Sequence, residues 1–169
     1  KSGAGTLVLS GSNFDISNTR IQEGTLKLGS ASAIYYRLTT PAASNATGAS
    51  NNGPTLQING AAVLDLNGFD FAGNNLNSIN PGGNQGSLSG GSIINSVSGT
   101  KTVTINTTTN NTWAGNIASG TGTINFNKYG NNTFTVANSN TFTGATVIGG
   151  GATTLVDLGA FRATSGITI

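Results

Sequence analysis

The sequence predicts an all-β protein built as a parallel β-helix, or β-solenoid, and three observations lead to this prediction. Apolar residues fall in pairs spaced two apart, which is typical of strands with one buried face. No window shows the sustained three-and-four spacing of an amphipathic helix. One phrase, Thr followed by apolar, any residue and apolar, recurs six times, and a chain that restates one short strand builds a stack of similar layers. The phrase begins at Thr6, Thr25, Thr55, Thr102, Thr123 and Thr133.

The residues between the strands fit the turns of such a stack. Gly, Ser, Thr and Asn make up more than half of the chain, and the dipeptides Asn52-Gly53, Asn59-Gly60 and Asn67-Gly68 tolerate the positive φ of sharp bends. Hydrophobic residues still reach 36%, so the composition favours a folded chain over a disordered one.

The strand phrases predict the core. In a parallel solenoid each coil pairs with the coils above and below, and inward side chains stack into apolar columns. At about 20 residues per coil we expect about seven or eight coils. The predicted core ladder consists of the apolar pairs Leu7 and Leu9, Leu26 and Leu28, Leu56 and Ile58, Leu64 and Leu66, Val103 and Ile105, Ile124 and Phe126, and Phe134 and Val136.

Domain organisation is simple. We expect a single solenoid segment over residues 1–169 that forms part of a longer repeat array, because the last repeat is incomplete. Two loose polar stretches, 39–54 and 73–91, predict loop insertions. No apolar run approaches the roughly 20 residues of a membrane span, so the sequence predicts no transmembrane segment.

The two ends of the chain repeat each other. Aligning Lys1 with Lys128 also brings Thr6 onto Thr133 and Leu9 onto Val136. The sequence therefore holds two copies of one unit, separated by a middle that departs from it.

These residues carry a family resemblance. Residues 3–34, GAGTLVLSGSNFDISNTRIQEGTLKLGSASAI, resemble the autotransporter-associated β-strand repeat of bacterial surface-protein passenger regions. Residues 63–79 look like the segment that follows it, and residues 119–150 resemble the next copy. The resemblance implies a right-handed parallel β-helix, exported and displayed on the outer surface of a Gram-negative-type cell. It also implies an extracellular structural or adhesive role.

Catalysis is disfavoured by the residues available. The chain has no His or Cys, which removes a conventional triad or zinc site, and we expect no cofactor, no metal and no catalytic residue. The remaining enzymatic hypothesis is a polysaccharide-processing β-helix that uses the nearest acidic pair, Asp65 and Asp70. The alternative interpretation makes one an outward strand residue and the other a turn residue.

One further candidate function and the expected partners follow from the remaining residues. Basic residues are scattered without a run, so we expect no nucleic-acid partner. Thr-x-Thr pairs suggest an alternative, an ice- or surface-binding solenoid; they lie at Thr102 and Thr104, Thr107 and Thr109, Thr133 and Thr135, and Thr141 and Thr143. Open strand edges at the ends of a solenoid predict further coils of the same polypeptide, or identical copies stacked end to end, as partners. Host-cell, glycan or abiotic surfaces are further candidate partners.

Overall fold

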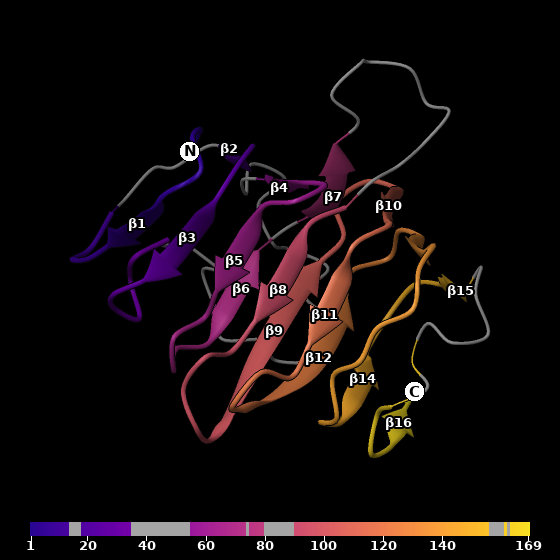
Figure 1. Cartoon of the computed structure of the whole chain (residues 1–169). Coiled ribbons are helices and arrows are strands. Elements are labelled where there is room, and N and C mark those ends of the chain that lie inside the picture. The colour runs from indigo at the N-terminus through magenta and orange to yellow at the C-terminus, as the bar shows by residue number, and fades with distance from the viewer. Residues whose placement is uncertain (14–17, 35–54, 74, 80–89, 156–160, 162) are drawn as a thin grey trace.

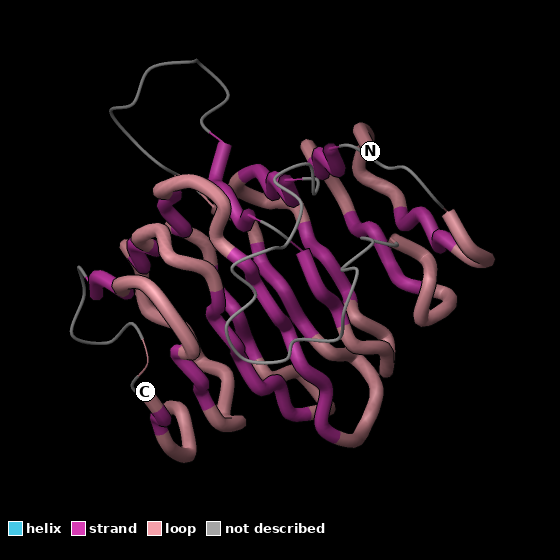
Figure 2. The backbone as a smooth tube through the Cα atoms, turned by 180° about the vertical axis from the view of Figure 1, so that it is seen from behind, coloured by secondary structure: helices cyan, strands magenta, loops and turns pink. Residues whose placement is uncertain are grey.

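A computed structural model describes residues 1–13, 18–34, 55–73, 75–79, 90–155, 161 and 163–169. This described part consists of short strands and turns and contains no helix (Figure 2). Its strands are β1 (Thr6–Leu9), β2 (Asn18–Ile21), β3 (Thr25–Leu28), β4 (Thr55–Asn59), β5 (Val63–Asp65), β6 (Phe71–Gly73), β7 (Asn75–Ile79), β8 (Ser92–Ile94), β9 (Thr100–Asn106), β10 (Asn111–Trp113), β11 (Asn116–Ala118), β12 (Thr123–Tyr129), β13 (Phe134–Val136), β14 (Thr146–Ile148), β15 (Thr153–Leu155) and β16 (Ile167–Thr168).

The described strands form four parallel sheets. Sheet 1 has the order β1-β3-β5-β8-β11, sheet 2 has β6-β9-β12-β14-β16, sheet 3 has β2-β4-β7 and sheet 4 has β10-β13-β15. Each neighbour in a sheet comes from the next coil of the chain, so the sheets run along the stack from the N-terminal end to the C-terminal end (Figure 1). The all-β class is confirmed, and parallel strands distributed over several sheets are consistent with a β-solenoid.

The middle of the stack has a regular winding. From β5 onward the chain visits sheet 1, then sheet 2, then sheet 3 or 4, as in β8, β9, β10 and again in β11, β12, β13. Strand β7 of sheet 3 contacts β10 of sheet 4, so these two sheets follow one another along one side of the stack. Before β5 the described strands alternate between sheets 1 and 3, and after β13 they alternate between sheets 2 and 4.

The interior is apolar, and most of the predicted ladder lies in it. Within sheet 1 the register stacks Leu7, Leu26, Leu64, Ile93 and Ile117 into one column. Twelve of the fourteen ladder residues are buried: Leu26, Leu28, Leu56, Ile58, Leu64, Leu66, Val103, Ile105, Ile124, Phe126, Phe134 and Val136.

Leu7 and Leu9 depart from the predicted ladder. Leu7 is 45% exposed, and Leu9 is only partly buried. Their strand, β1, is the terminal strand of sheet 1 and pairs with β3 on one side alone among the described strands. The expectation that Leu7 is buried is therefore wrong for this chain, because no described coil covers it.

Aromatic side chains fill the C-terminal half of the interior. The ring centroid of Phe126 lies 5.7 Å from that of Phe134, 6.1 Å from that of Phe142 and 5.8 Å from that of Phe161. Phe142 and Phe161 meet edge to face at 5.6 Å. The Phe126–Phe134 pair is stacked and the other pairs are tilted or edge to face, which are the favoured arrangements for aromatic rings. The four rings thus form one cluster.

The predicted loop 73–91 is partly a strand. Strand β7 occupies Asn75–Ile79 and pairs in parallel with β4, so a loop over the whole stretch is wrong. Its sequence lacks clear apolar alternation, and pairing with a neighbouring coil overrides the weak local preference. Residues 80–89 and the whole of the predicted loop 39–54, with its Asn52-Gly53 turn, lie outside the described residues.

The other two Asn-Gly turns behave differently from each other. Asn67 and Gly68 both have positive φ, at 49° and 83°, as the dipeptide predicts. At Asn59-Gly60 the chain also turns, with the amide of Ala62 donating to the carbonyl of Asn59 at 2.8 Å. Neither residue there has a positive φ, so this dipeptide marks a turn without the left-handed conformation.

Candidate functional site

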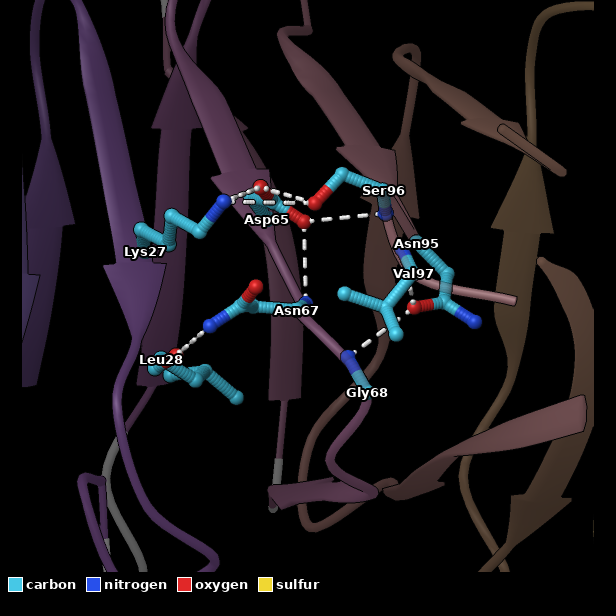
Figure 3. A network of polar contacts seen from close by, with 8 residues as sticks. All are labelled: Lys27, Leu28, Asp65, Asn67, Gly68, Asn95, Ser96 and Val97. Carbon is cyan, nitrogen blue, oxygen red and sulfur yellow. Dashed lines mark hydrogen bonds and ion pairs between the residues drawn. The ribbon is translucent and has the colours of Figure 1, made fainter. Parts of the chain in front are cut away.

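The densest polar network among the described residues centres on Asp65, which is 4% exposed (Figure 3). Its Oδ1 atom accepts hydrogen bonds from the backbone amides of Asn67 at 2.9 Å and Ser96 at 3.1 Å. Its Oδ2 atom accepts the Ser96 hydroxyl at 2.7 Å and lies 3.3 Å from Lys27 Nζ. Lys27 belongs to β3, Asp65 to β5, and Ser96 follows β8, so one carboxylate joins three successive strands of sheet 1.

Two asparagines extend the same network. Asn95 is buried, and its Oδ1 atom accepts the amides of Gly68 at 3.0 Å and Val97 at 3.4 Å. The side-chain amide of Asn67 donates to the carbonyl of Leu28 at 2.8 Å. These bonds satisfy backbone groups where the strands of sheet 1 end and the turns begin, where no ladder partner exists.

The electrostatics of Asp65 follow from its partners. Burial alone raises the pKa of a carboxyl group, because it disfavours the charged form. Hydrogen bonds from the Ser96 hydroxyl, from the amides of Asn67 and Ser96 and from Lys27 outweigh this effect and bring the pKa of Asp65 below its ordinary value of 3.8. The carboxylate is therefore charged at neutral pH, and its charge is balanced by Lys27.

This geometry suits cohesion better than catalysis. A Ser hydroxyl beside a Lys amine, here 3.4 Å apart, resembles a nucleophile with its base. The Ser96 hydroxyl, however, donates to Asp65, and the Lys27 ammonium is paired with the same carboxylate. Both groups are thus engaged in holding Asp65.

The two acidic residues that the enzymatic hypothesis pairs, Asp65 and Asp70, bind different partners in the structure. Asp65 holds the network after β5 and β8, whereas Asp70 Oδ1 accepts the amide of Thr102 at 2.8 Å. Each carboxylate thus ties its own coil to the next one. No group of three or more His, Cys, Asp or Glu residues that would hold a metal ion occurs within the described ranges.

The threonine pairs do not form the expected array on sheet 2. Thr102 and Thr104 of β9 lie in register with Asn125 and Asn127 of β12, so asparagine interrupts the rank. On sheet 4, by contrast, Thr112, Thr135 and Thr154 lie in register on three consecutive strands. This rank joins one residue from the predicted pairs to two that the pairs did not include.

A second polar site lies inside the stack at Lys128, which is 0% exposed. Its amine donates to the carbonyls of Gly130 and Asn132, both at 2.8 Å, and to that of Gly150. Burial lowers the pKa of this amine from its ordinary value of 10.5. The sequence analysis missed this residue, although the alternation Ile124, Phe126, Lys128 places it on the inward face. Lys27, Asn95 and Ser96 were missed as well, and no periodic signal marks them.

Comparison with known protein families identifies the repeat. The family model described as the passenger-associated-transport-repeat matches residues 1–28 and 126–156. The match confirms the resemblance to the repeat of autotransporter passenger regions, and its two segments contain Lys1 and Lys128, the positions that align the two internal copies. In these two segments the chain is thus similar to a repeat that is associated with autotransporter passenger regions.

The other comparisons returned nothing comparable. No curated protein and no solved structure matched the chain. A search of the described residues also found no helix with the length and apolar character required to cross a membrane.

Proposed function

We propose that this chain is a structural and adhesive segment of a bacterial extracellular surface protein, a rigid stalk that displays its loops to host-cell, glycan or abiotic surfaces. The observation that carries the proposal is the passenger repeat at both ends of a stack of parallel strands. Hydrogen-bonded ladders along every coil distribute load over the whole stack. The proposal includes export to the cell surface, a right-handed winding and about seven or eight coils, which agree with the repeat and with about 20 residues per coil.

The role is proposed to be non-enzymatic. Asp65 and Ser96 bind one another and Lys27, and Asp70 binds a backbone amide. The competing hypothesis is a glycan-processing β-helix that uses Asp65 and Asp70. A screen of the purified chain against bacterial and host polysaccharides tests it: turnover that disappears in the Asp70→Asn variant would establish the enzymatic hypothesis, and absence of turnover is the expected result.

We propose that the ends of the stack bind further coils, either of the same polypeptide or of identical copies. The support comes from comparing equivalent strands. Strand β13 lies between β10 and β15, and its Phe134 and Val136 are buried. The equivalent strand β1 has one described neighbour, and the counterparts of these two residues are less buried: Leu7 is 45% exposed and Leu9 is only partly buried. An uncovered strand edge with apolar side chains is a template for another strand.

Electron microscopy of the purified chain tests this stacking. We expect rods that lengthen with protein concentration. The variant Leu7→Lys places a charge at the open β1 edge and should yield short particles, whereas Val97→Lys, a matched change at another exposed apolar residue, should leave the rods unchanged. Short, dispersed particles from the unaltered chain at high concentration would contradict the proposal.

Ice or surface binding through threonine is the second candidate, and the rank Thr112, Thr135 and Thr154 favours it. Neighbouring strands place these residues about 4.8 Å apart. A thermal-hysteresis assay decides: activity in the unaltered chain that is lost in Thr135→Lys would support this function, and absence of activity would remove it.

A further inference from the structure

Lys128 occupies a position where an apolar residue is expected. It lies on the inward face of β12, and its register partners are Ile105 of β9 and Ile148 of β14. A lysine is almost never fully buried unless its charge has a partner. No ion pair to Lys128 is present in the part of the chain that the structure describes, so its ammonium is balanced by other groups.

Those groups are backbone carbonyls from two successive turns. Gly130 and Asn132 belong to the turn that follows β12, and Gly150 belongs to the turn that follows β14, the next strand of sheet 2. An ammonium group has three donors, and here each has one acceptor. The Asn132 carbonyl also accepts the Thr107 hydroxyl at 3.0 Å, so it would keep one partner without the amine. Each of the three carbonyls would nevertheless lose one hydrogen bond inside the protein.

The surrounding turns are shaped to admit the amine. Gly130 and Gly151 have positive φ, at 81° and 63°. A Cβ at Gly151 would lie 2.6 Å from Lys128 Nζ and 2.6 Å from the carbonyl oxygen of Gly130. Any residue other than glycine at position 151 would therefore occupy the space that the amine and its acceptor use.

The first copy of the repeat builds a similar arrangement at Lys1, in which two acceptors correspond and the third is the carbonyl of Ser2 at 3.3 Å. The side-chain amine of Lys1 donates to the carbonyl of Gly3 and, at 2.8 Å, to the carbonyl of Glu23. Gly3 and Glu23 correspond to Gly130 and Gly150 in the second copy. Gly3 and Gly24 have positive φ, at 82° and 65°, close to the values of their counterparts. The Lys1 and Lys128 sites thus share two corresponding acceptors and two glycine turns, although their surroundings differ. This indicates that the arrangement recurs with the repeat.

We propose that the Lys-x-Gly phrase of this repeat forms a lysine clip, in which the buried ammonium ties the turn of its own coil to the turn of the next coil through backbone carbonyls. The clip holds the two glycine turns in register where the strand ladder ends. The Lys128 clip lies between β9 and β14 and is enclosed, whereas the Lys1 clip lies at the end of the stack and is partly exposed. The inference does not depend on the proposed surface function.

The charged groups near Lys128 are few in the described residues. Strand β9 presents Ile105 and strand β14 presents Ile148, and the following turn contributes the glycines 149–151. Tyr129, the next residue in sequence, carries a titratable group, and its side chain lies on the opposite side of β12 by the alternation of that strand. The carbonyl dipoles are thus the immediate partners of the charge.

Three measurements on the full chain test the clip. In the unaltered protein, nitrogen-15 NMR should show Lys128 amine hydrogens that exchange with water far more slowly than those of Lys101, which is partly exposed at the start of β9. The variant Lys128→Met keeps a side chain of similar length without the donors and should lower the midpoint of thermal unfolding by at least about 5 °C. Amide hydrogen exchange should rise about tenfold or more at residues 130–132 and 149–151 and stay unchanged in β3 and β5.

Matched variants complete the design. Lys101→Met, on the same sheet, should leave the midpoint unchanged, and Lys1→Met should lower it less than Lys128→Met because the Lys1 site is partly exposed. If Lys128→Met fails to fold, the NMR measurement on the unaltered protein decides alone. The proposal is overturned if the Lys128 amine hydrogens exchange as fast as those of Lys101, or if Lys128→Met unfolds at or above the temperature of the unaltered chain.

Discussion

Leu7 and Phe134 occupy equivalent positions in the two copies of the repeat, yet Leu7 is 45% exposed and Phe134 is fully buried. Their strands also belong to different sheets, since β1 pairs with β3 in sheet 1 and β13 pairs with β15 in sheet 4. The repeat unit therefore specifies a pair of strands and their turns rather than a fixed side of the stack. What differs between the copies is the neighbour that covers them.

This difference predicts unequal costs of truncation. Phe134→Ala removes a ring that packs on Phe126 and should cost about 3–5 kcal/mol of unfolding free energy. Leu7→Ala removes a side chain that is already partly in water and should cost less than about 1 kcal/mol. Urea denaturation of both variants provides the comparison, and equal losses would contradict the assignment of β1 to the open end.

The Asp65 network predicts a loss of stability in acid. The pKa of Asp65 is lower in the folded chain than its ordinary value of 3.8, so its stabilising contribution is fully present above that value and is lost as the pH falls through the lowered pKa. Asp65→Asn should lose about 1–3 kcal/mol at neutral pH, because it removes the ion pair with Lys27. The stability difference between the two chains should shrink below pH 3.8 in urea titrations. Asp70→Asn serves as the control, and a difference that is independent of pH would count against a charged Asp65.

Lys128 predicts a pH effect of the same sign in the alkaline range. Burial lowers the pKa of its amine below 10.5, so the unfolded chain binds more protons than the folded chain between the two values. The contribution of this group to stability therefore rises as the pH increases through the folded pKa toward 10.5. Subtracting the stability of Lys128→Met from that of the unaltered chain at each pH isolates the effect. A difference that falls instead would mean that the carbonyls hold the pKa above its ordinary value.

The glycine turns predict that alanine is costly at Gly151 and tolerated at Gly5. Gly151→Ala must adopt a positive φ of 63° and place its Cβ 2.6 Å from a carbonyl oxygen, so we expect a loss of about 2–4 kcal/mol. Gly5→Ala has no atom within 4 Å of the added Cβ and should be nearly neutral. Calorimetry of the two variants separates them, and a neutral Gly151→Ala would show that this turn is not as tight as described.

Much of the fold follows from local pattern. The Thr phrases at Thr6, Thr25 and Thr123 all lie in strands, because alternation of apolar residues is sufficient to select an extended chain with one buried face. The same phrase carries no information about the sheet it joins, which depends on the length and path of the turns between strands. Strand β7 shows the converse, since it pairs with β4 without a local alternating pattern.

The polar sites were harder to predict than the core. Asp65 was recognised as notable, but its partners Lys27 and Ser96 are distant in sequence and meet only because three coils lie in register. The alternation that begins at Ile124 places Lys128 on the inward face of its strand. A lysine is nevertheless expected at the surface, because its charge is costly to bury. Prediction therefore succeeds where the signal is periodic and fails where it depends on the stacking of coils.

Successive coils of this chain lie in parallel register, and the absence of cysteine from the sequence allows engineered disulfides to test this register directly. Thr112 and Thr135 are register partners on β10 and β13, and Thr154 follows one strand further on β15. Neighbouring strands separate Cα atoms by about 4.8 Å, within the range a disulfide spans, whereas two strands exceed it. We predict that Thr112→Cys with Thr135→Cys forms a disulfide under mild oxidation and that Thr112→Cys with Thr154→Cys does not. Failure of the first pair to cross-link within one folded chain, or equal cross-linking of both pairs, would contradict the account.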